Sequence, residues 1–206
     1  ASCSEWYSAV LNNAIDGECY HDAEELFDAL KEAEPSDACT FEFDDSELEP
    51  YRRNISHSRQ YREDDDLIVE TDEKEVYVSD GLMVKAWLNV NPSIDDPALS
   101  YKVLHFLQRL GKIRSINPPY LPCVREFGIA TKSSSLFMVT DRVEGFTWNK
   151  SLIGSKQRLA VVDKLIESVE HLHGLGLYHG DLHPGNIILT KEIDGFDLTL
   201  IDVPDF

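Results

Sequence analysis

The sequence predicts an α+β fold that combines short antiparallel strands with two longer helices. Residues 67–69, 76–78 and 82–84 are short β-prone runs, and the turn-like segments 71–74 and 79–81 separate them. Apolar residues then recur at helical spacing from Pro97 to Gly111 and, over a longer stretch, from Lys156 to His173. We therefore expect an antiparallel meander followed by a mixture of helices and further strands.

The composition is that of an ordinary globular protein. The 206 residues are 42% hydrophobic and 10% aromatic, which is enough for one sizeable core or two small ones. No apolar run approaches the roughly 20 residues that cross a bilayer, and the N-terminus lacks the basic-then-apolar order of a secretory signal. The four cysteines form no CxxC pair, so reduced thiols are expected. These observations predict a cytoplasmic protein that does not enter a membrane.

The negative charge is concentrated in the N-terminal part of the chain. The formal net charge is -19, and residues 1–80 hold 24 Asp and Glu against 6 Lys and Arg, whereas residues 81–206 hold 14 against 13. Such a surface repels phosphate backbones, so direct binding of nucleic acid is not expected. The acidic region is either a solvated face or a docking surface for a basic partner.

Residues 1–65 are predicted to form an acidic, mostly helical extension. Residues 5–33 have the pattern of two short amphipathic helices, and Asp22 is a suitable N-cap with Glu25 at the capping-box distance. Residues 34–66 are rich in Pro, Ser, Asp and Glu, with aromatic residues between them. That composition is typical of a linker or of an extended arm laid over a neighbour.

The two longer helices alternate with strands in the rest of the chain. Pro97 stands where a first helical turn tolerates proline, and an extended segment at 124–130 and a strand at 136–140 follow that helix. Strands are also expected at 187–190 and 198–201. The long helix carries a continuous apolar stripe made of Leu159, Val162, Leu165, Ile166, Val169 and Leu172.

The most informative segment is Tyr178-His179-Gly180-Asp181-Leu182-His183-Pro184-Gly185-Asn186, followed by the apolar run Ile187-Ile188-Leu189. An Asp, four intervening residues and an Asn before a short strand resemble the catalytic loop of the protein-kinase-like superfamily. In that loop a carboxylate accepts or orients the proton of an attacking hydroxyl, and an amide oxygen holds magnesium on the phosphates. The resemblance implies that Asp181 is the base and Asn186 a metal ligand.

Other segments extend this resemblance. The run 198–202 is a strand that ends in Asp where the superfamily keeps its main magnesium ligand, and 136–145 resembles the strand and hinge that bind adenine. A lysine in the strand 83–87 matches the one that neutralises the α- and β-phosphates of ATP. The resemblance thus implies Lys85 as a catalytic phosphate clamp, Thr140 as gatekeeper, Asp141 and Val143 as main-chain partners of adenine, and Asp202 as a magnesium ligand.

The resemblance implies a bilobal protein-kinase-like fold. Residues 66–145 would form the N-lobe sheet, its helix and the hinge, and residues 146–206 the first part of a helical C-lobe. It also implies ATP and Mg²⁺ as cofactors, and transfer of the γ-phosphoryl group to a hydroxyl as in an atypical Ser/Thr protein kinase, on a protein rather than on a small molecule. Two alternatives stay open: a small-molecule kinase, because the loop also resembles aminoglycoside and choline phosphotransferases, and a pseudokinase that binds a partner or nucleotide without turnover.

Several features depart from ordinary protein kinases. The segment 70–75 has no glycine, so it cannot bring several main-chain amides to the phosphates in the usual way. The helix from Pro97 has no glutamate to pair with Lys85, so either Asp95 or Asp96 replaces it or Lys85 is held differently. His183 stands where protein kinases keep a lysine. The rest of the larger lobe is expected from a longer parent protein or from another chain, because the apolar helix face would otherwise be exposed.

Overall fold

The computed structural model describes residues 10, 20, 22–33, 43–57, 67–150, 154–193 and 195–202. The chain divides into two compact units, Ala1–Glu42 and Phe43–Phe206. None of the helices in these described ranges is both long and apolar enough to pass through a lipid bilayer.

The first unit contains helix α2 (Ala23–Ala33). The carboxylate of Asp22 accepts a hydrogen bond of 2.9 Å from the Glu25 main-chain N–H, which confirms the predicted N-cap. On the exposed side of the helix, the Lys31 ammonium lies 4.5 Å from the centroid of the Phe27 ring. The other predicted helix of this region lies outside the described residues, apart from the helical Val10.

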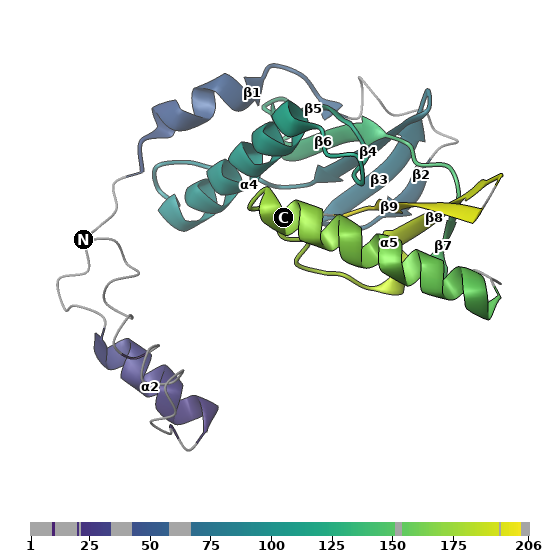
Figure 1. The fold of residues 1–206 in the computed structure, drawn as a ribbon. Coiled ribbons are helices and arrows are strands. Elements are labelled where there is room, and N and C mark those ends of the chain that lie inside the picture. Colours follow the sequence, from purple (N-terminus) through teal and green to yellow (C-terminus); the bar gives the residue numbers. More distant parts are fainter. Residues whose placement is uncertain are drawn as a thin grey trace. The chain divides into compact units, whose positions relative to one another are not determined.

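The second unit contains two sheets and two long helices (Figure 1). The larger sheet has six strands in the order β1-β5-β6-β4-β3-β2, and the smaller one has three in the order β7-β8-β9. Its elements are η1 (Asp45–Tyr51), β1 (Arg52–Arg53), β2 (Leu67–Glu70), β3 (Lys74–Ser79), β4 (Leu82–Trp87), α4 (Pro97–Ile116), β5 (Val124–Ala130), β6 (Ser135–Asp141), β7 (Phe146–Thr147), η2 (Trp148–Lys150), α5 (Ser155–Gly174), η3 (Pro184–Asn186), β8 (Ile187–Glu192) and β9 (Gly195–Leu200). The predicted α+β fold and the predicted antiparallel meander are confirmed.

The pairing register gives the larger sheet two different faces. Strand β4 pairs antiparallel with both β3 and β6, so that Lys85 lies opposite Val76 on one side and Met138 on the other. Because side chains alternate along a strand, these residues share one face of the sheet. The opposite face carries a buried cluster of its own, made of Tyr77, Val84, Ala86, Ala130, Phe137 and Val139.

Helix α4 covers the face of the sheet that carries Lys85 (Figure 1). The carboxylate of Asp96 accepts a hydrogen bond of 3.0 Å from the Leu99 N–H and caps the helix, while Pro97 occupies the first turn. The ring of Phe106 packs edge-on against Trp87 of β4, with centroids 5.0 Å apart. The helix continues past Gly111 to Ile116, because buried Ile113 extends its apolar side; the predicted end at Gly111 was wrong.

Residues 43–57 belong to the second unit, although the sequence analysis placed them in the N-terminal extension. Phe43 and Leu48 are buried in the core next to α4, and β1 pairs in parallel with the edge of β5. The chain passes so close to β5 that a Cβ atom at Gly128 would lie 2.5 Å from the carbonyl oxygen of Tyr51. The acidic residues between the few apolar ones concealed this packing in the sequence.

Helix α5 packs with only part of its apolar stripe. Leu172 is buried, and so is Val161, which the sequence analysis did not include. By contrast, Leu159, Val162 and Ile166 are exposed to 68%, 36% and 52%. Within the described residues one side of α5 therefore presents apolar side chains to solvent.

Gly145→Ala is expected to lower the free energy of unfolding of the second unit by about 1–3 kcal/mol. Gly145 has a φ of 147°, and a Cβ there would lie 2.5 Å from the carbonyl oxygen of Leu189 in β8. Urea denaturation followed by tryptophan fluorescence measures the loss. Gly174→Ala is the control, because Gly174 is helical and has no atom within 4 Å of an added Cβ. Equal stability of the two variants would contradict the close approach of β7 and β8.

Candidate active site

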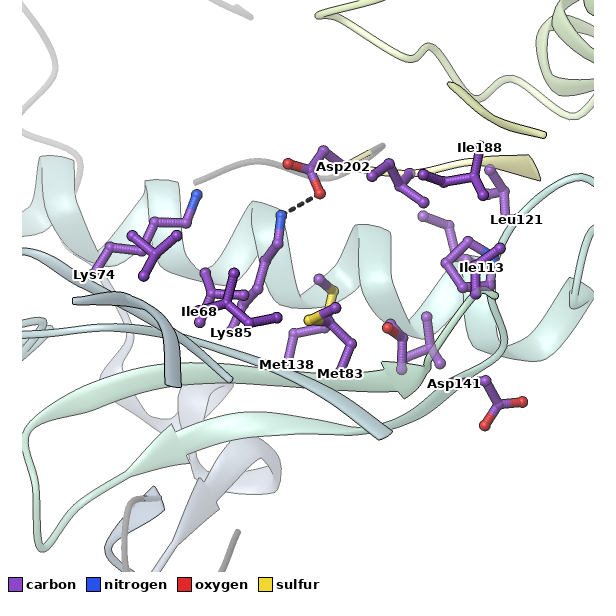
Figure 2. Close-up of a pocket in the computed structure, with 17 residues that line it drawn as sticks. Ile68, Lys74, Met83, Lys85, Ile113, Leu121, Met138, Asp141, Ile188 and Asp202 are labelled. Carbon is purple, nitrogen blue, oxygen red and sulfur yellow. Dashed lines mark hydrogen bonds and ion pairs between the residues drawn. The ribbon is translucent and has the colours of Figure 1, made fainter. Parts of the chain in front are cut away.

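A pocket of about 360 Å³ lies between the larger sheet and the end of β9 (Figure 2). Its volume falls in the range of small-molecule sites, about 300–1,000 Å³. The walls are mostly apolar and come from β2, β3, β4, β6 and the smaller sheet. They include Ile68, Val76, Met83, Met138, Ile188 and Ile201. Such walls suit a flat, apolar ring system with a polar group at one end.

Five of the seven predicted site residues line this pocket: Lys85, Thr140, Asp141, Val143 and Asp202. The other two, Asp181 and Asn186, lie in the loop that precedes β8 and are not among the lining residues. A main-chain hydrogen bond nevertheless connects that loop to Ile201, the neighbour of Asp202. The structure thus brings the predicted residues into one region of the second unit.

Lys85 is held by Asp202 at the closed end of the pocket. Its side chain is only 8% exposed, and its ammonium forms an ion pair and hydrogen bond with the Asp202 carboxylate (Figure 2). The sequence left open whether Asp95 or Asp96 pairs with Lys85 or whether Lys85 is held differently. The structure shows that Lys85 is held by Asp202, while Asp96 caps α4. Ser100, which stands near the expected position of the acid, donates its hydroxyl to the Ser93 carbonyl.

The backbone around Asp202 fixes its carboxylate near Lys85. The Leu200 N–H donates to the Tyr120 carbonyl at 2.9 Å, and the Ile201 N–H donates to the Asn186 carbonyl at 2.9 Å. Asp202 itself has a left-handed φ of 62°, which is uncommon for a residue with a side chain. Such strained residues cluster at functional sites, where the surrounding structure holds them.

Asp181 and Asn186 are hydrogen-bonded to each other. The Asn186 side-chain nitrogen lies 3.0 Å from the carbonyl oxygen of Asp181 and 3.5 Å from one of its carboxylate oxygens. Because the nitrogen is used in this way, the amide oxygen is the atom that Asn186 can offer to a cation. Asn186 is 7% exposed, whereas the side chain of Asp181 is 71% exposed. The carboxylate of Asp181 is therefore open to a second molecule.

Two histidines adjoin Asp181. The Nδ1 atom of His183 accepts the Gly185 N–H at 3.0 Å, so the proton of the neutral ring is on Nε2, which lies 3.7 Å from the Asp181 carboxylate. His179 is buried, and within the described ranges neither of its ring nitrogens has a hydrogen-bond partner. Burial lowers the pKa of His179, although the charges of Asp181 and Asp202 act in the opposite direction.

The hinge side of the pocket is held by main-chain hydrogen bonds. Thr140 is 7% exposed and pairs with Met83 across the sheet, so its side chain faces the pocket. The Asp141 N–H donates to the Cys123 carbonyl at 3.0 Å, so a hydrogen bond from this residue to a bound base would have to use its carbonyl oxygen. Its carboxylate forms a bidentate ion pair with Arg125 at 2.6 and 2.7 Å.

The residues fit a magnesium ion that is bound together with phosphates. No group of three or more His, Cys, Asp or Glu side chains suited to a metal occurs in the part of the chain that the structure describes. Magnesium does not require such a cage, since it is usually bound by one or two carboxylates together with substrate phosphates and water. The carboxylate of Asp202 and the amide oxygen of Asn186 supply suitable oxygen donors.

The sequence analysis missed Lys74, which it assigned to a turn. Lys74 is the first residue of β3, is partly buried and lines the pocket beside Ile68 and Val69 of β2. Figure 2 shows the Lys74 ammonium on the same side of the pocket as the Lys85 ammonium and the Asp202 carboxylate. The signal was available, because Lys74 and Val76 are two residues apart and so face the same way in a strand.

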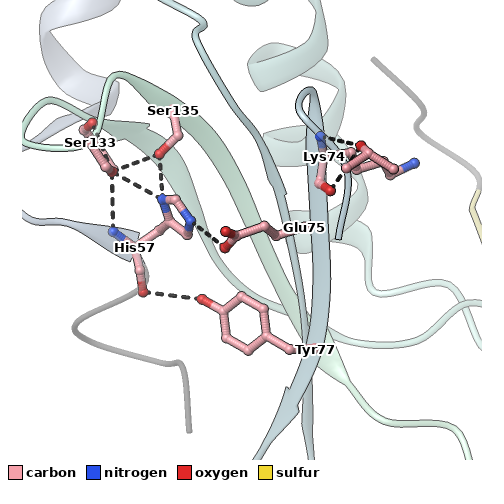
Figure 3. A network of polar contacts seen from close by, with 8 residues as sticks. His57, Lys74, Glu75, Tyr77, Ser133 and Ser135 are labelled. Atoms are coloured by element: carbon pink, nitrogen blue, oxygen red, sulfur yellow. Dashed lines mark hydrogen bonds and ion pairs between the residues drawn. The ribbon is translucent and has the colours of Figure 1, made fainter. Parts of the chain in front are cut away.

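A second polar cluster lies on the opposite face of the larger sheet (Figure 3). The buried ring of His57 contacts Glu75 through Nε2 at 3.1 Å and Ser135 through Nδ1 at 2.6 Å. The Tyr77 hydroxyl donates to the His57 carbonyl at 3.1 Å. None of these residues lines the pocket, so the cluster attaches residues 52–57 to the sheet rather than contributing to the site.

Comparison with known proteins gives relatives over part of the chain, one of which is named as a kinase. No family model matches. Protein GFS12 of Arabidopsis thaliana is 32% identical over 108 residues, which are 50% of this chain and 6% of that protein. CBL-interacting serine/threonine-protein kinase 18 of Arabidopsis thaliana is 29% identical over 94 residues, 44% of this chain and 18% of that protein. The chain thus spans less than a fifth of these relatives.

Among solved structures, the PknI kinase domain of Mycobacterium tuberculosis (double mutant C20A_R136A) is similar with a TM-score of 0.46 and 19% identity. The match covers 68% of this chain and 56% of that one. The strands and helices of the second unit form an α+β fold with a six-stranded and a three-stranded sheet. The predicted resemblance to protein kinases is confirmed by the similarity in sequence to the curated serine/threonine-protein kinase.

His57→Ala is expected to lower the free energy of unfolding by about 1–3 kcal/mol, because Glu75 loses a buried partner. Amide hydrogen exchange should also accelerate at Thr131 and Lys132, whose N–H groups donate to the Arg53 and Ile55 carbonyls. His105→Ala on the exposed side of α4 serves as the control and should change stability by less than about 0.5 kcal/mol. Unchanged exchange at both amides would show that His57 does not hold the segment.

Proposed function

We propose that this chain binds Mg²⁺ and ATP in the pocket and belongs to a phosphotransferase that moves the γ-phosphoryl group to a hydroxyl. The observation that carries the proposal is a chain of contacts from Lys85 and Asp202, which line an apolar pocket, through the hydrogen bond between Ile201 and Asn186 to Asp181 in the adjoining loop. A cation, two carboxylates and an amide oxygen are the groups that phosphoryl transfer requires. The apolar walls next to the hinge suit the adenine ring.

In the proposed reaction the acceptor hydroxyl oxygen attacks the γ-phosphorus while the bond from that phosphorus to the β–γ bridging oxygen breaks. Asp181 accepts the proton of the hydroxyl, and ADP leaves with the electron pair of the broken bond. Lys85 binds the α- and β-phosphates. Asp202 and Asn186 would hold Mg²⁺, which when bound would supply charge neutralisation of the phosphates. Catalysis by these residues consists mainly of positioning and charge compensation.

A protein hydroxyl is the acceptor we favour. The Asp181 carboxylate is 71% exposed at an open surface, where it can be reached by a large substrate. One of the curated relatives is named as a serine/threonine-protein kinase. A small-molecule acceptor would instead need a pocket that encloses it next to Asp181, and the cavity at the site lies on the Lys85 side.

A nucleotide-binding pseudokinase is the second candidate function. It is favoured by the turn between β2 and β3, where Thr71 engages the main-chain N–H groups of Glu73 and Lys74 at 3.3 and 2.9 Å. Amides held in this way are not directed to a phosphate. The two candidates differ in one respect only, since both bind ATP and only the enzyme transfers phosphate.

Mg²⁺ and ATP together are expected to raise the melting temperature of residues 1–206. At a ligand concentration of about 100 times Kd the stabilisation is about 2.7 kcal/mol. Thermal unfolding is measured with ATP and magnesium, with ATP and EDTA, and with magnesium alone. Asp202→Asn should remove the magnesium-dependent part of the stabilisation. If ATP does not shift the transition under any condition, both candidate functions are wrong.

Asp181→Asn in the natural protein is expected to reduce phosphate transfer by at least about a hundredfold, because the acceptor hydroxyl loses its base. ATP binding should stay within about twofold, since Asp181 is not among the lining residues of the pocket. Transfer from γ-labelled ATP to a mixture of protein substrates measures the first quantity, and calorimetry the second. Undiminished labelling by the variant would contradict the role of Asp181. Nucleotide binding without labelling by the unmodified protein would identify a pseudokinase.

A further inference from the structure

In the turn between β2 and β3, three main-chain N–H groups donate to acceptors of the turn itself and are not directed toward a ligand. The Thr71 N–H donates to the Lys74 carbonyl at 2.9 Å. The Glu73 and Lys74 N–H groups donate to the Thr71 hydroxyl oxygen. The turn is also tied to β4, because the Leu88 N–H donates to the Glu73 carbonyl at 2.8 Å. These three N–H groups are therefore not free for a ligand. Positive charge at this end of the pocket has to come from side chains.

Among the described residues that line the pocket, the cationic side chains are those of Lys74 and Lys85. Lys85 already interacts with the Asp202 carboxylate. Strand register places the two lysines on one face of the sheet, because Val76 lies opposite Lys85 and Lys74 lies opposite Trp87. The ammonium of Lys74 lies over the Trp87 indole, 5.5 Å from its centroid, in a cation–π contact that holds it at this end of β4.

The order of these residues along the sheet matches the direction of a bound nucleotide. Met83 pairs with Thr140 at the hinge end of β4, Lys85 is two residues farther along, and Lys74 lies opposite Trp87 at the far end. At about 3.3 Å per residue, Lys74 is about 13 Å along the strand from the hinge pair. A nucleotide with its base at the hinge and its α- and β-phosphates at Lys85 would extend its terminal phosphate toward Lys74.

We propose that Lys74 is a phosphate-binding residue, which supplies at the far end of the pocket the positive charge that the main-chain amides of the β2–β3 turn do not. The inference rests on the proposed nucleotide-binding function and assigns Lys74 to the terminal phosphate of ATP. Asp72 and Glu73 are exposed in the same turn, and their negative charge makes a compensating cation at this position necessary. Lys74 thereby selects a triphosphate over an uncharged nucleoside.

The test compares ATP with adenosine by calorimetric titration of residues 1–206 in the presence of magnesium. Lys74→Met keeps most of the aliphatic stem and removes the charge. It should weaken ATP binding about tenfold and leave adenosine binding within about twofold. Lys74→Arg should retain most of the ATP affinity. Lys132→Met, at an exposed lysine in the β5–β6 turn outside the pocket lining, is the matched control and should change neither affinity.

The results separate this inference from the proposed function. If the unmodified chain binds neither ATP nor adenosine, the proposed function and the inference both fail. If it binds ATP and Lys74→Met does not change the ratio of the two affinities, only the role of Lys74 is refuted. An equal loss for ATP and adenosine also refutes it, because Lys74 would then contribute only the packing of its stem. A selective loss for ATP that shrinks at high salt supports a charge interaction with phosphate.

Discussion

The alternation of side chains along three adjacent strands organises the second unit. Because β3, β4 and β6 are in antiparallel register, one face of the sheet carries Lys74, Lys85 and the apolar walls of the pocket. The other face is buried beneath a cluster around Tyr77 and the His57 contacts. A shift of one residue in the register of β4 would move Lys85 to the wrong face. The pocket therefore depends on cores on both sides of the sheet.

The second constraint is electrostatic. Asp202 lies near Asn186 because the main chain of Ile201 is hydrogen-bonded to it, and its carboxylate contacts Lys85. One ion pair thus joins the smaller sheet to the larger one across the pocket. The carboxylates of Asp202 and of Asp72 and Glu73 in the β2–β3 turn repel a triphosphate unless cations are present. This balance explains why magnesium and both lysines have complementary roles in the proposed binding.

The second unit also uses more of the acidic part of the chain than its composition suggests. Phe43 and Leu48 are buried although their neighbours are mostly charged, and the buried polar contacts of His57 attach residues 52–57 to β3 and β6. In this region a few well-placed side chains determine the packing. The high charge around them remains in solvent and does not oppose it. Composition averaged over the segment therefore gave a misleading picture of where the unit begins.

The sequence by itself determined the order of most elements, since the strand and helix periodicities predicted at 67–84, 97–111 and 156–173 reflect local burial, and it contained the loop motif with Asp181 and Asn186. The resemblance to protein kinases also predicted Lys85 and Asp202 as site residues, and both line the pocket. Only the tertiary structure decided that these two residues pair with each other, that Lys74 reaches the same pocket, and that residues 43–57 pack on the sheet. The physical reason is that periodicity records which residues are buried, whereas partners distant in sequence depend on the register between strands. Lys85 and Asp202, for example, meet only after β4 and β9 have taken their places in different sheets.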